Sequence, residues 1–437
     1  MSLKKIKSKE AAVGIIGLGY VGLPLAIAFA QKGVKIIGFD TDASKIASIN
    51  QGVSYFKHIA SEKLQDHVSN GLISAAEGFS KLAEVDCILI CVPTPLSKHR
   101  EPDLTAVLET GKEIAKHLRK GQLVVLESST YPGTTSEELA SVLSVSGLEI
   151  DKDFYLAYSP EREDPGNKDF STSDINKIVG ADCEEGLQLA TALYEHIVPT
   201  VVQVSSTKTA EAVKLTENIF RSVNIAMVNE LKLIFEEMGI DVWEVIDAAA
   251  SKPFGYMPFY PGPGLGGHCI PIDPFYLTYK ARQFDVPTRF IELAGEINTS
   301  MPKIVVSACA LALSAHSEKA VKNSRILVVG LAYKNDIDDM RESPALVLTE
   351  LLEGRGAIVD YYDDFIPVIP KSRKHAKLAG RKSIEFSKEN IAEYDLVLIS
   401  TKHSNVNFQL LADHADIIVD TRNAMKGISG KAKIVKA

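Results

Sequence analysis

The sequence predicts an α/β protein in which two Rossmann-like, doubly wound domains are joined by a central helical layer. Three observations lead to this prediction. A strand–glycine turn–helix–strand pattern opens the chain, a similar pattern returns in its last third, and a long stretch without glycine or proline lies between them. A chain of 437 residues also exceeds what one hydrophobic core usually organises. We expect domains over residues 1–206, 207–317 and 318–437.

The first domain opens with the elements of a dinucleotide-binding fold. In chain order they are a strand at residues 12–16, the turn Gly17-Leu-Gly-Tyr-Val-Gly22, a helix at 23–31, a strand at 35–39 and the acid Asp40. Further strands at 85–92 and 122–127, with helices at 104–118 and 135–143, continue the alternation. A chance glycine-rich turn is the alternative, but it would not come with these flanking elements.

Each glycine of this turn has a physical task. Gly17 permits the tight turn, Gly19 lets the backbone approach a pyrophosphate, and Gly22 lets the helix pack on the strand. The pyrophosphate would lie at the helix N-terminus, where free N–H groups and the helix dipole favour an anion. Asp40 can accept hydrogen bonds from a ribose 2′-hydroxyl and would repel a 2′-phosphate, so the cofactor expected is NAD rather than NADP.

The last domain repeats the pattern in a weaker form. A strand at residues 324–329, Gly330, a helix at 344–353 and a strand at 357–362 ending in Asp363 are followed by strands at 396–400 and 417–420. Its turn lacks the second and third glycines, which argues against a second dinucleotide site. A degenerate nucleotide-binding half is our prediction, and a purely structural α/β domain is the alternative.

The central layer is predicted from helical periodicity over residues 207–238 and a second helical block at 287–316. Its wide apolar surface is compatible with a dimer interface and with packing against its own domains. Lys214, Asn218 and Arg221 share one face of the first helix. That face is either solvated, or it presents a cation and an amide that suit an alcohol or an oxyanion.

Two loops carry further reactive side chains. The loop at residues 259–273 places four glycines and two prolines before Cys269 and Asp273, so its backbone amides could wrap a phosphate or a sugar beside a thiol nucleophile. A buried structural cysteine is the alternative. The loop at 159–167 follows an apolar strand at 154–158, where Glu161 and its neighbours are placed for acid–base work or form a solvated loop.

Composition excludes several classes of protein. A net charge of −8 argues against general nucleic-acid binding, although local amides and cations can still hold a small phosphorylated ligand. The five cysteines lack paired metal-ligand spacing, which predicts reduced thiols and no metal site. No apolar run of about 18 residues and no secretory leader is recognised, so we expect a cytoplasmic protein without membrane partners.

Six motifs occur in order along the chain: Gly17-Leu-Gly-Tyr-Val-Gly22, Glu127-Ser-Ser-Thr130, Ser159-Pro-Glu161, Lys214-Leu-Thr-Glu-Asn218, Gly266-Gly-His-Cys269 with Asp273, and Lys334 with Arg341-Glu-Ser. Together they resemble the UDP-glucose/UDP-mannose dehydrogenase family over nearly the whole chain. The resemblance implies an enzyme that oxidises C6 of a UDP-sugar to a carboxylate with NAD, in two steps through a thiohemiacetal and a thioester. From the apolar central helices we also expect a homodimer or a higher homo-oligomer.

The resemblance also implies roles for individual residues. It implies Cys269 as nucleophile, with Lys214, Asn218 and Asp273 around the reacting carbon, and Thr130 and Glu161 near the hydrolytic water. Further cofactor contacts are expected at Tyr20, Val21, Thr94, Thr130 and Arg341. Further substrate contacts are expected at Arg162, Arg221, Tyr260, Gly264, Gly266, Gly267, His268, Lys334 and Arg422.

One segment departs from the glucose branch of this family. That branch carries a second glutamate after its Ser/Asn-Pro, whereas here the segment runs from Glu161 through Pro165 to Asn167. This form resembles the N-acetylhexosamine branch, so UDP-N-acetylglucosamine is the substrate expected first, before its galacto and manno counterparts and UDP-glucose. Two other functions remain open: a single-step dehydrogenase of the β-hydroxyacid type, and a non-catalytic NAD-binding sensor.

Overall fold

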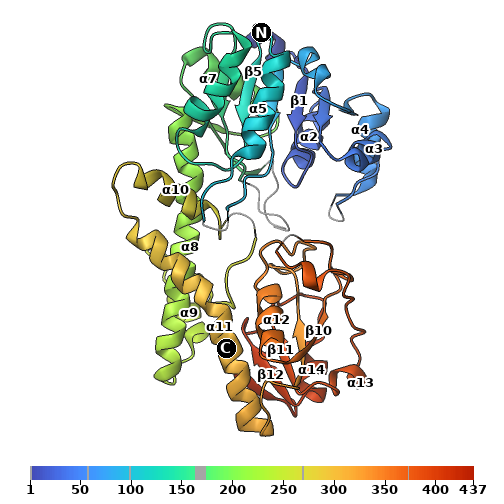
Figure 1. The fold of residues 1–437 in the computed structure, drawn as a ribbon, viewed down its shortest axis with the longest axis vertical. Coiled ribbons are helices and arrows are strands. Elements are labelled where there is room, and N and C mark those ends of the chain that lie inside the picture. The colour runs from blue at the N-terminus through green and yellow to red at the C-terminus, as the bar shows by residue number, and fades with distance from the viewer. Residues whose placement is uncertain (1, 57–58, 98–99, 163–173, 268–269, 373) are drawn as a thin grey trace. The chain divides into compact units, whose positions relative to one another are not determined.

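The structure is a computed structural model that describes residues 2–56, 59–97, 100–162, 174–267, 270–372 and 374–437. The chain forms two compact units, which Figure 1 shows as ribbons. Unit 1 comprises Met1–Asn218 and Ile272–Pro287, and unit 2 comprises Ile219–Pro271 and Thr288–Ala437. Each unit contains one largely parallel sheet with helices on both faces, which confirms the predicted α/β class.

The sheet of unit 1 has eight strands in the order β3-β2-β1-β4-β5-β6-β7-β8. Their bounds are β1 Val13–Ile16, β2 Ile36–Phe39, β3 Ile73–Ala76, β4 Cys87–Ile90, β5 Leu123–Leu126, β6 Tyr155–Tyr158, β7 Lys177–Ala181 and β8 Val201–Val204. Neighbouring strands are parallel except for the antiparallel pair β6 and β7. The first six strands have the order of a dinucleotide-binding fold, with its switch point between β1 and β4.

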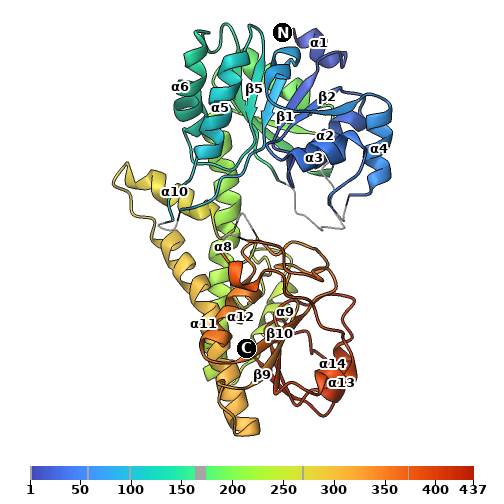
Figure 2. The ribbon, with the colours of Figure 1, turned by 45° about the vertical axis from the view of Figure 1, so that its right-hand side comes forward.

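Two hydrophobic cores cover the faces of this sheet. Its helices are α1 Leu3–Lys7, α2 Gly22–Gln31, α3 Ala43–Asn50, α4 Ser61–Ser69, α5 Thr105–His117, α6 Ala140–Leu143, α7 Glu184–Tyr194, the N-terminal part of α8 (Thr207–Glu237) and α10 Asp273–Arg282, with short 3-10 turns at Ser80–Glu84 and Ser144–Ser146. Alternate strand residues pack on α1–α4 and α7 on one face, and on α5 and α6 on the other. Figure 2 shows the strands between α5 and α6 on one side and α2, α3 and α4 on the other.

Local sequence explains where some elements begin. The helix expected at residues 135–143 starts instead as a π-helical turn, Thr134–Leu139, and continues as α6. Helices α9 (Val242–Ala250) and α10 were not predicted, although Asp241 caps the first by accepting a hydrogen bond from the Trp243 N–H. Helix α8 ends at Glu237, two residues before the positive-φ residue Gly239 and close to the end that periodicity predicted.

Unit 2 holds a parallel five-stranded sheet in the order β10-β9-β11-β12-β13. Its strands are β9 Arg325–Val329, β10 Ile358–Tyr362, β11 Leu396–Ile399, β12 Ile417–Asp420 and β13 Lys433–Lys436. Its helices are the rest of α8, α9, α11 Arg289–Ser317, α12 Pro344–Gly354, α13 Lys388–Ile391 and α14 Phe408–His414, with a 3-10 turn at Ala376–Leu378. The core places α11 and α12 on one face and α13 and α14 on the other.

Helix α11 is long and apolar enough to cross a membrane by length and composition alone. It contains Pro302, and its buried residues Val305, Val306, Cys309 and Leu313 belong to the same core as β9 and β11. The core helix of a soluble domain meets the same criterion, and this packing is that of a core helix.

Candidate functional site

The glycine turn after β1 has the geometry that its sequence predicts. Gly17 has a φ of +92°, and a Cβ there would lie 2.6 Å from the carbonyl oxygen of Cys91 at the end of β4. A Cβ at Gly22 would lie 1.9 Å from the Gly17 oxygen, so only glycine lets α2 begin this close to the strand. Gly19 has open space beside it, as a backbone approached by a pyrophosphate requires.

Asp40 ends β2 beside this turn. Its Oδ2 accepts hydrogen bonds from the Leu18 N–H at 2.9 Å and from the Lys45 ammonium at 3.1 Å, and its Oδ1 accepts one from the Asp42 N–H at 2.9 Å. The carboxylate is thereby fixed at the edge of the turn, where a ribose hydroxyl would meet it. These residues fit an NAD molecule, whose phosphates would meet the Gly19 backbone and whose adenosine ribose would meet Asp40.

Two aromatic residues that the sequence did not single out cover the turn. The Tyr55 hydroxyl donates to the Leu18 carbonyl, and the Phe56 ring lies 4.5 Å from the Tyr20 ring, between centroids. Burial, followed by the charges of Asp40 and Asp42, raises the pKa of Tyr55 well above its usual value, so the hydroxyl is a neutral donor. Tyr20, expected as a cofactor contact, is thus part of a small aromatic cover.

A second cluster of unit 1 forms where α8 meets the start of α10. Asn218 Nδ2 donates to Asp273 Oδ2 at 2.6 Å, and both side chains are buried. Asp273 Oδ1 is buried and, within the described residues, has no hydrogen-bond partner. Burial raises the pKa of Asp273 to about 6, opposed by the nearby charge of Lys214 and by the Asn218 hydrogen bond. The cluster therefore contains a carboxyl group that can change protonation near neutral pH.

Lys214, one turn before Asn218, is also buried, and its ammonium donates to the main-chain oxygen of Glu161, just beyond β6. Lys214 and Asn218 therefore do not lie on a solvated surface. The third residue of the predicted face, Arg221, is exposed and lies in unit 2. Arg162 pairs with Glu217 of α8 at 2.7 Å and donates to the Asn176 carbonyl at 2.6 Å, so it ties this loop to α8.

Thr130 follows β5 and is fully buried, with its hydroxyl donating to Thr134 at 2.5 Å. Glu211 of α8 holds this segment, because its carboxylate accepts the Gly133 N–H at 2.6 Å, the Thr135 N–H at 2.8 Å and the Thr135 hydroxyl at 2.7 Å. Burial raises the pKa of Glu211 to about 7. One helix thus carries Glu211, Lys214 and Asn218 on successive turns.

Thr94, expected as a cofactor contact, is buried in unit 1. Its carbonyl oxygen accepts a hydrogen bond from the Tyr276 hydroxyl of α10 at 2.8 Å. The bond connects the segment after β4, which lies on the switch-point side of the sheet, to the helix that begins at Asp273.

The glycine-rich loop in unit 2 is shaped by close packing. The Gly262 N–H donates to Asn229 at 3.0 Å, and the Gly267 N–H donates to the Arg341 carbonyl at 3.0 Å. A Cβ at Gly262 would lie 2.5 Å from Arg422 Nη1, and one at Gly266 would lie 2.5 Å from the Tyr333 Cβ. These two amides are therefore bound within the chain and are not free to donate to a ligand.

Other predicted contacts of unit 2 have partners of their own. Gly264 has a φ of +135° and packs toward Pro302. Arg422 Nε donates to the Ser400 carbonyl at 2.9 Å, the exposed Tyr260 donates to Asp247 at 2.9 Å, and Arg341 forks onto Asp339 with its shortest contact at 2.6 Å. Lys334 is half-buried on the same loop as Asp339.

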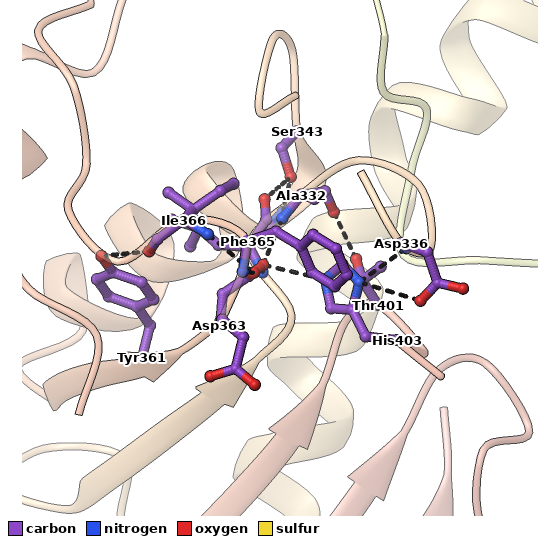
Figure 3. A network of polar contacts seen from close by, with 12 residues as sticks. Ala332, Asp336, Ser343, Tyr361, Asp363, Phe365, Ile366, Thr401 and His403 are labelled. Carbon is purple, nitrogen blue, oxygen red and sulfur yellow. Dashed lines mark hydrogen bonds and ion pairs between the residues drawn. The ribbon is translucent and has the colours of Figure 1, made fainter. Parts of the chain in front are cut away.

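A network behind that loop surrounds Asp363, the acid at the end of β10 (Figure 3). Asp363 Oδ2 accepts the N–H groups of Leu331 and Ala332 at 2.6 and 3.0 Å, and lies 3.0 Å from His403 Nε2. Because His403 Nδ1 accepts the Asp336 N–H at 2.9 Å, Nε2 carries the proton and donates to Asp363. Asp363 Oδ1 accepts two further N–H groups, from Phe365 and Ile366.

Comparison with known proteins identifies the family. Models of the UDP-glucose/GDP-mannose dehydrogenase family match residues 11–198 as the NAD binding domain, 208–300 as the central domain and 327–427 as the UDP binding domain. The chain belongs to the UDP-glucose/GDP-mannose dehydrogenase family. The motifs indicated this family, although its mannose nucleotide is GDP-mannose, which corrects the UDP-mannose of the sequence-based expectation.

Individual relatives agree over most of their length. A UDP-N-acetyl-D-glucosamine 6-dehydrogenase of Pseudomonas aeruginosa is 36% identical over 360 residues, which are 82% of this chain and 84% of the relative. A solved UDP-D-ManNAc dehydrogenase from Pyrococcus horikoshii has a TM-score of 0.87 at 32% identity, covering 97% of this chain and 98% of the other. The S. aureus UDP-N-acetyl-mannosamine dehydrogenase Cap5O has a TM-score of 0.82 at 30% identity, with 98% of both chains covered.

Family membership makes the chain an NAD-dependent UDP-sugar 6-dehydrogenase. The two acids Asp40 and Asp363 have different roles in the two units. Both end the second strand of a Rossmann-like unit, but Asp363 is buried and saturated by five donors, so it cannot accept a ribose hydroxyl. The UDP-binding domain of this chain therefore uses its acid to shape the loop after β9.

The structure brings together some of the predicted catalytic residues of this dehydrogenase. Lys214, Asn218, Asp273 and the Glu161 main chain form one contact cluster in unit 1. His268, Cys269 and the loop residues 163–173 lie outside the described residues. Sequence reasoning missed Glu211 and Tyr55, since one acid in an amphipathic helix and one tyrosine in a loop carry no motif. The polar spacing from Glu211 to Asn218 is the signal that could have indicated Glu211.

Proposed function

We propose that this enzyme oxidises the C6 alcohol of a UDP-N-acetylhexosamine, UDP-N-acetylglucosamine first, to the uronic acid by two successive oxidations. The observation that carries the proposal is the buried contact between Asn218 and Asp273 next to Lys214, which leaves one carboxylate oxygen open in a site that also carries an ammonium group. Such a site can bind an alcohol, accept its proton and stabilise an oxyanion.

In the proposed reaction NAD supplies the hydride acceptor for both oxidations. Asp273, with Lys214 close by, would take the proton of the C6 hydroxyl, directly or through water. The Cys269 thiolate would then add to the aldehyde carbon, and Lys214 and Asn218 would stabilise the oxyanion of the thiohemiacetal. After the second oxidation, Glu161 or Asp273 would take a proton from the water that hydrolyses the thioester, with Thr130 near that water.

The choice of an N-acetylhexosamine is supported by the names of relatives and by one segment of the sequence. Relatives that cover most of the chain are named for UDP-N-acetylglucosamine or UDP-N-acetylmannosamine. Pro165 occupies the segment in which the glucose branch has its second glutamate. Because an epimeric hydroxyl is read by a few side-chain contacts, the gluco substrate is our first proposal and the manno substrate the second.

The test is a panel of UDP-N-acetylglucosamine, UDP-N-acetylgalactosamine, UDP-N-acetylmannosamine and UDP-glucose, assayed by NADH formation and by mass spectrometry of the product. We expect the highest kcat/KM with UDP-N-acetylglucosamine and a uronic acid as product. Cys269→Ala should form no acid, and unchanged acid formation by this variant would refute covalent catalysis. A higher kcat/KM with UDP-N-acetylmannosamine would transfer the assignment to the manno substrate.

Binding roles for the remaining predicted residues belong to the same proposal. NAD would contact Tyr20, Val21, Thr94 and Arg341, and the UDP-sugar would contact Arg162, Arg221, Tyr260, Lys334 and Arg422 with the loop from Gly264 to His268. We further propose a homo-oligomer, because Phe220, Met227 and Ile234 recur every seven residues on α8 and are about half exposed in the single chain. Light scattering of the purified protein tests this, and a monomeric mass would contradict it.

A cytoplasmic location is also proposed. Within the described part of the chain, Cys91, Cys183 and Cys309 form no disulfide, which suits a reducing compartment. Cell fractionation with an antibody against the protein would test it, and recovery in a secreted fraction would contradict it.

A further inference from the structure

A buried charge cluster lies behind Glu161 in unit 1, and the proposed reaction does not use it. Glu127 at the end of β5 is fully buried, and its Oε2 accepts a hydrogen bond from the Lys177 ammonium at 2.6 Å. The Tyr194 hydroxyl, from the last residue of α7, donates to the other oxygen of Glu127. The ammonium also lies 5.1 Å from the centroid of the Tyr194 ring.

The same ammonium reaches toward the proposed active site. Lys177 Nζ lies 4.0 Å from Oε2 of Glu161, at the outer limit of an ion pair. The lysine side chain is only 8% exposed and that of Glu161 only 15%. Glu161 is thus held at two points, since Lys214 donates to its main-chain oxygen and Lys177 faces its carboxylate.

The Lys177 ammonium faces two carboxylates, those of Glu127 and Glu161. Burial raises the pKa of Glu127, with Lys177 opposing the rise and Glu161 adding to it. Burial alone would lower the pKa of Lys177, but Glu127 and Glu161 raise it above its usual value. Burial also raises the pKa values of the Tyr194 hydroxyl and the Cys91 thiol, the other groups that face the ammonium, so these two stay neutral.

An ion pair between Glu127 and Lys177 alone would be a structural feature. If Lys177 only neutralised Glu127, a second carboxylate beside it would be unnecessary. A second buried negative charge destabilises the folded protein, so we expect it to have a function. The cluster stands at the carboxyl ends of β5 and β6, which is the edge of an open α/β sheet where ligands bind.

We infer that Lys177 is a positioning residue for the hydrolytic half of the reaction: its ammonium faces and orients the Glu161 carboxylate, while Glu127 and Tyr194 hold the lysine in place. This inference rests on the proposed function, in which Glu161 is a candidate base. In hydrolysis, water adds to the thioester carbon, Glu161 takes one proton, the carbon–sulfur bond breaks, and the Cys269 thiolate and the uronic acid are released.

The inference predicts opposite effects for two substitutions. Lys177→Met leaves two buried carboxylates facing each other, so the acidic limb of the pH profile for hydrolysis should move to higher pH. Glu127→Gln leaves the ammonium to Glu161 alone, so the same limb should move to lower pH. When the limb moves up by one pH unit, hydrolysis at a fixed pH below it slows about tenfold. A purely structural pair would lower activity at all pH values without moving the limb.

The experiment mixes full-length enzyme, NAD and the UDP-sugar in a single turnover across the mildly acidic to mildly alkaline range. It follows NADH by absorbance and the mass of Cys269-linked sugar by intact-protein mass spectrometry. For Lys177→Met we expect unchanged formation of the first NADH and a covalent adduct that accumulates at low pH. Lys177→Arg keeps the charge and should restore turnover without accumulation, and Tyr194→Phe should move the limb by much less than Lys177→Met.

Results with the wild-type enzyme distinguish a failure of this inference from a failure of the proposed function. If wild type forms no uronic acid, the proposed function fails. If wild type forms the acid but Lys177→Met and Glu127→Gln move the limb in the same direction, or not at all, the role of Lys177 is wrong. Thermal unfolding and NADH binding are measured for each variant, and if Lys177→Met does not fold, the comparison of Lys177→Arg with Glu127→Gln decides by the same limb.

Discussion

Asn218 of α8 donates a 2.6 Å hydrogen bond to Asp273, the first residue of α10, and leaves the second oxygen of that carboxylate buried and open within the part of the chain that the structure describes. The contact joins two segments that are 55 residues apart in the chain. Lys214 lies one turn earlier on α8, and its charge opposes the rise in the pKa of the same carboxyl. The N-terminal part of α8 therefore positions the charged groups of the site.

This arrangement predicts how stability depends on the Asp273 carboxyl. Its pKa rises from 3.8 to about 6 on folding, so the folded protein binds a proton more tightly than the unfolded chain, and stability falls as pH rises from about 4 to about 6. Asp273→Asn should therefore stabilise the protein at pH 8 by up to about 3 kcal/mol, and should lose activity. Thermal unfolding at pH 5 and pH 8 measures this, and a variant less stable than wild type at both values contradicts it.

Glu211 provides a second prediction on α8. Glu211→Ala would leave the N–H groups of Gly133 and Thr135 buried without an acceptor, which costs about 1–3 kcal/mol. The pKa of Glu211 rises from 4.5 to about 7 on folding, so the wild type loses stability as pH rises through this range. The difference in unfolding free energy between the wild type and the variant should therefore become smaller at higher pH. Urea unfolding at pH 5 and pH 8 tests this, with the exposed Glu230→Ala as the control on the same helix. A deficit that widens with pH would refute the assignment.

Asp40 should decide between the two nicotinamide coenzymes. Asp40→Ser removes the negative charge that opposes a 2′-phosphate and frees Lys45, now 3.1 Å from Asp40 Oδ2, to meet one. We expect the KM for NAD to rise about tenfold or more and the relative use of NADP to increase. Steady-state kinetics with both coenzymes measure the effect. Asp42→Ser, which alters only the exposed cap of α3, should leave the preference unchanged.

We expect His403 to support binding of the UDP-sugar but to have no effect on binding of NAD. His403→Phe keeps the ring that stacks on Phe365 but removes both the acceptor of the Asp336 N–H and the donor to Asp363. The loop that carries Lys334 should loosen, and the KM for the UDP-sugar should rise about fivefold or more. NAD affinity, measured by fluorescence titration, should not change. The exposed His316→Ala is the control, and an unchanged KM in His403→Phe would show that the network does not support the site.

Local patterns in the sequence were enough to predict most of the framework. The three glycines of the first turn, the acid that ends β2 and the apolar period of α8 each have a stereochemical cause that operates within a few residues. For this reason β1, β2, α2 and α8 were predicted with ends close to those observed. Helices α9 and α10 were missed because they follow loops rich in glycine, proline or aspartate and are short.

The site was predicted less completely, for reasons of tertiary packing. In the sequence, Lys214 and Asn218 look like part of a solvated face, but in the fold Lys214 contacts the segment after β6 and Asn218 contacts the start of α10. The loop around Gly262 appeared to offer free amides, but Asn229 and Arg341 bind two of them. Lys177, Glu127 and Tyr194 are far apart in the chain, and only the sheet order β5-β6-β7 with α7 brings them together. Burial of charged groups is a property of the assembled fold, which no single segment encodes.

The number of hydride equivalents per sugar tests covalent catalysis most directly. Wild-type enzyme is given limiting UDP-N-acetylglucosamine and excess NAD, and NADH is counted at completion together with the mass of the sugar product. Covalent capture at Cys269 predicts two NADH and one uronic acid for each sugar consumed, with no free aldehyde. One NADH per sugar, with the oxidised sugar released as an aldehyde, would contradict the proposed reaction.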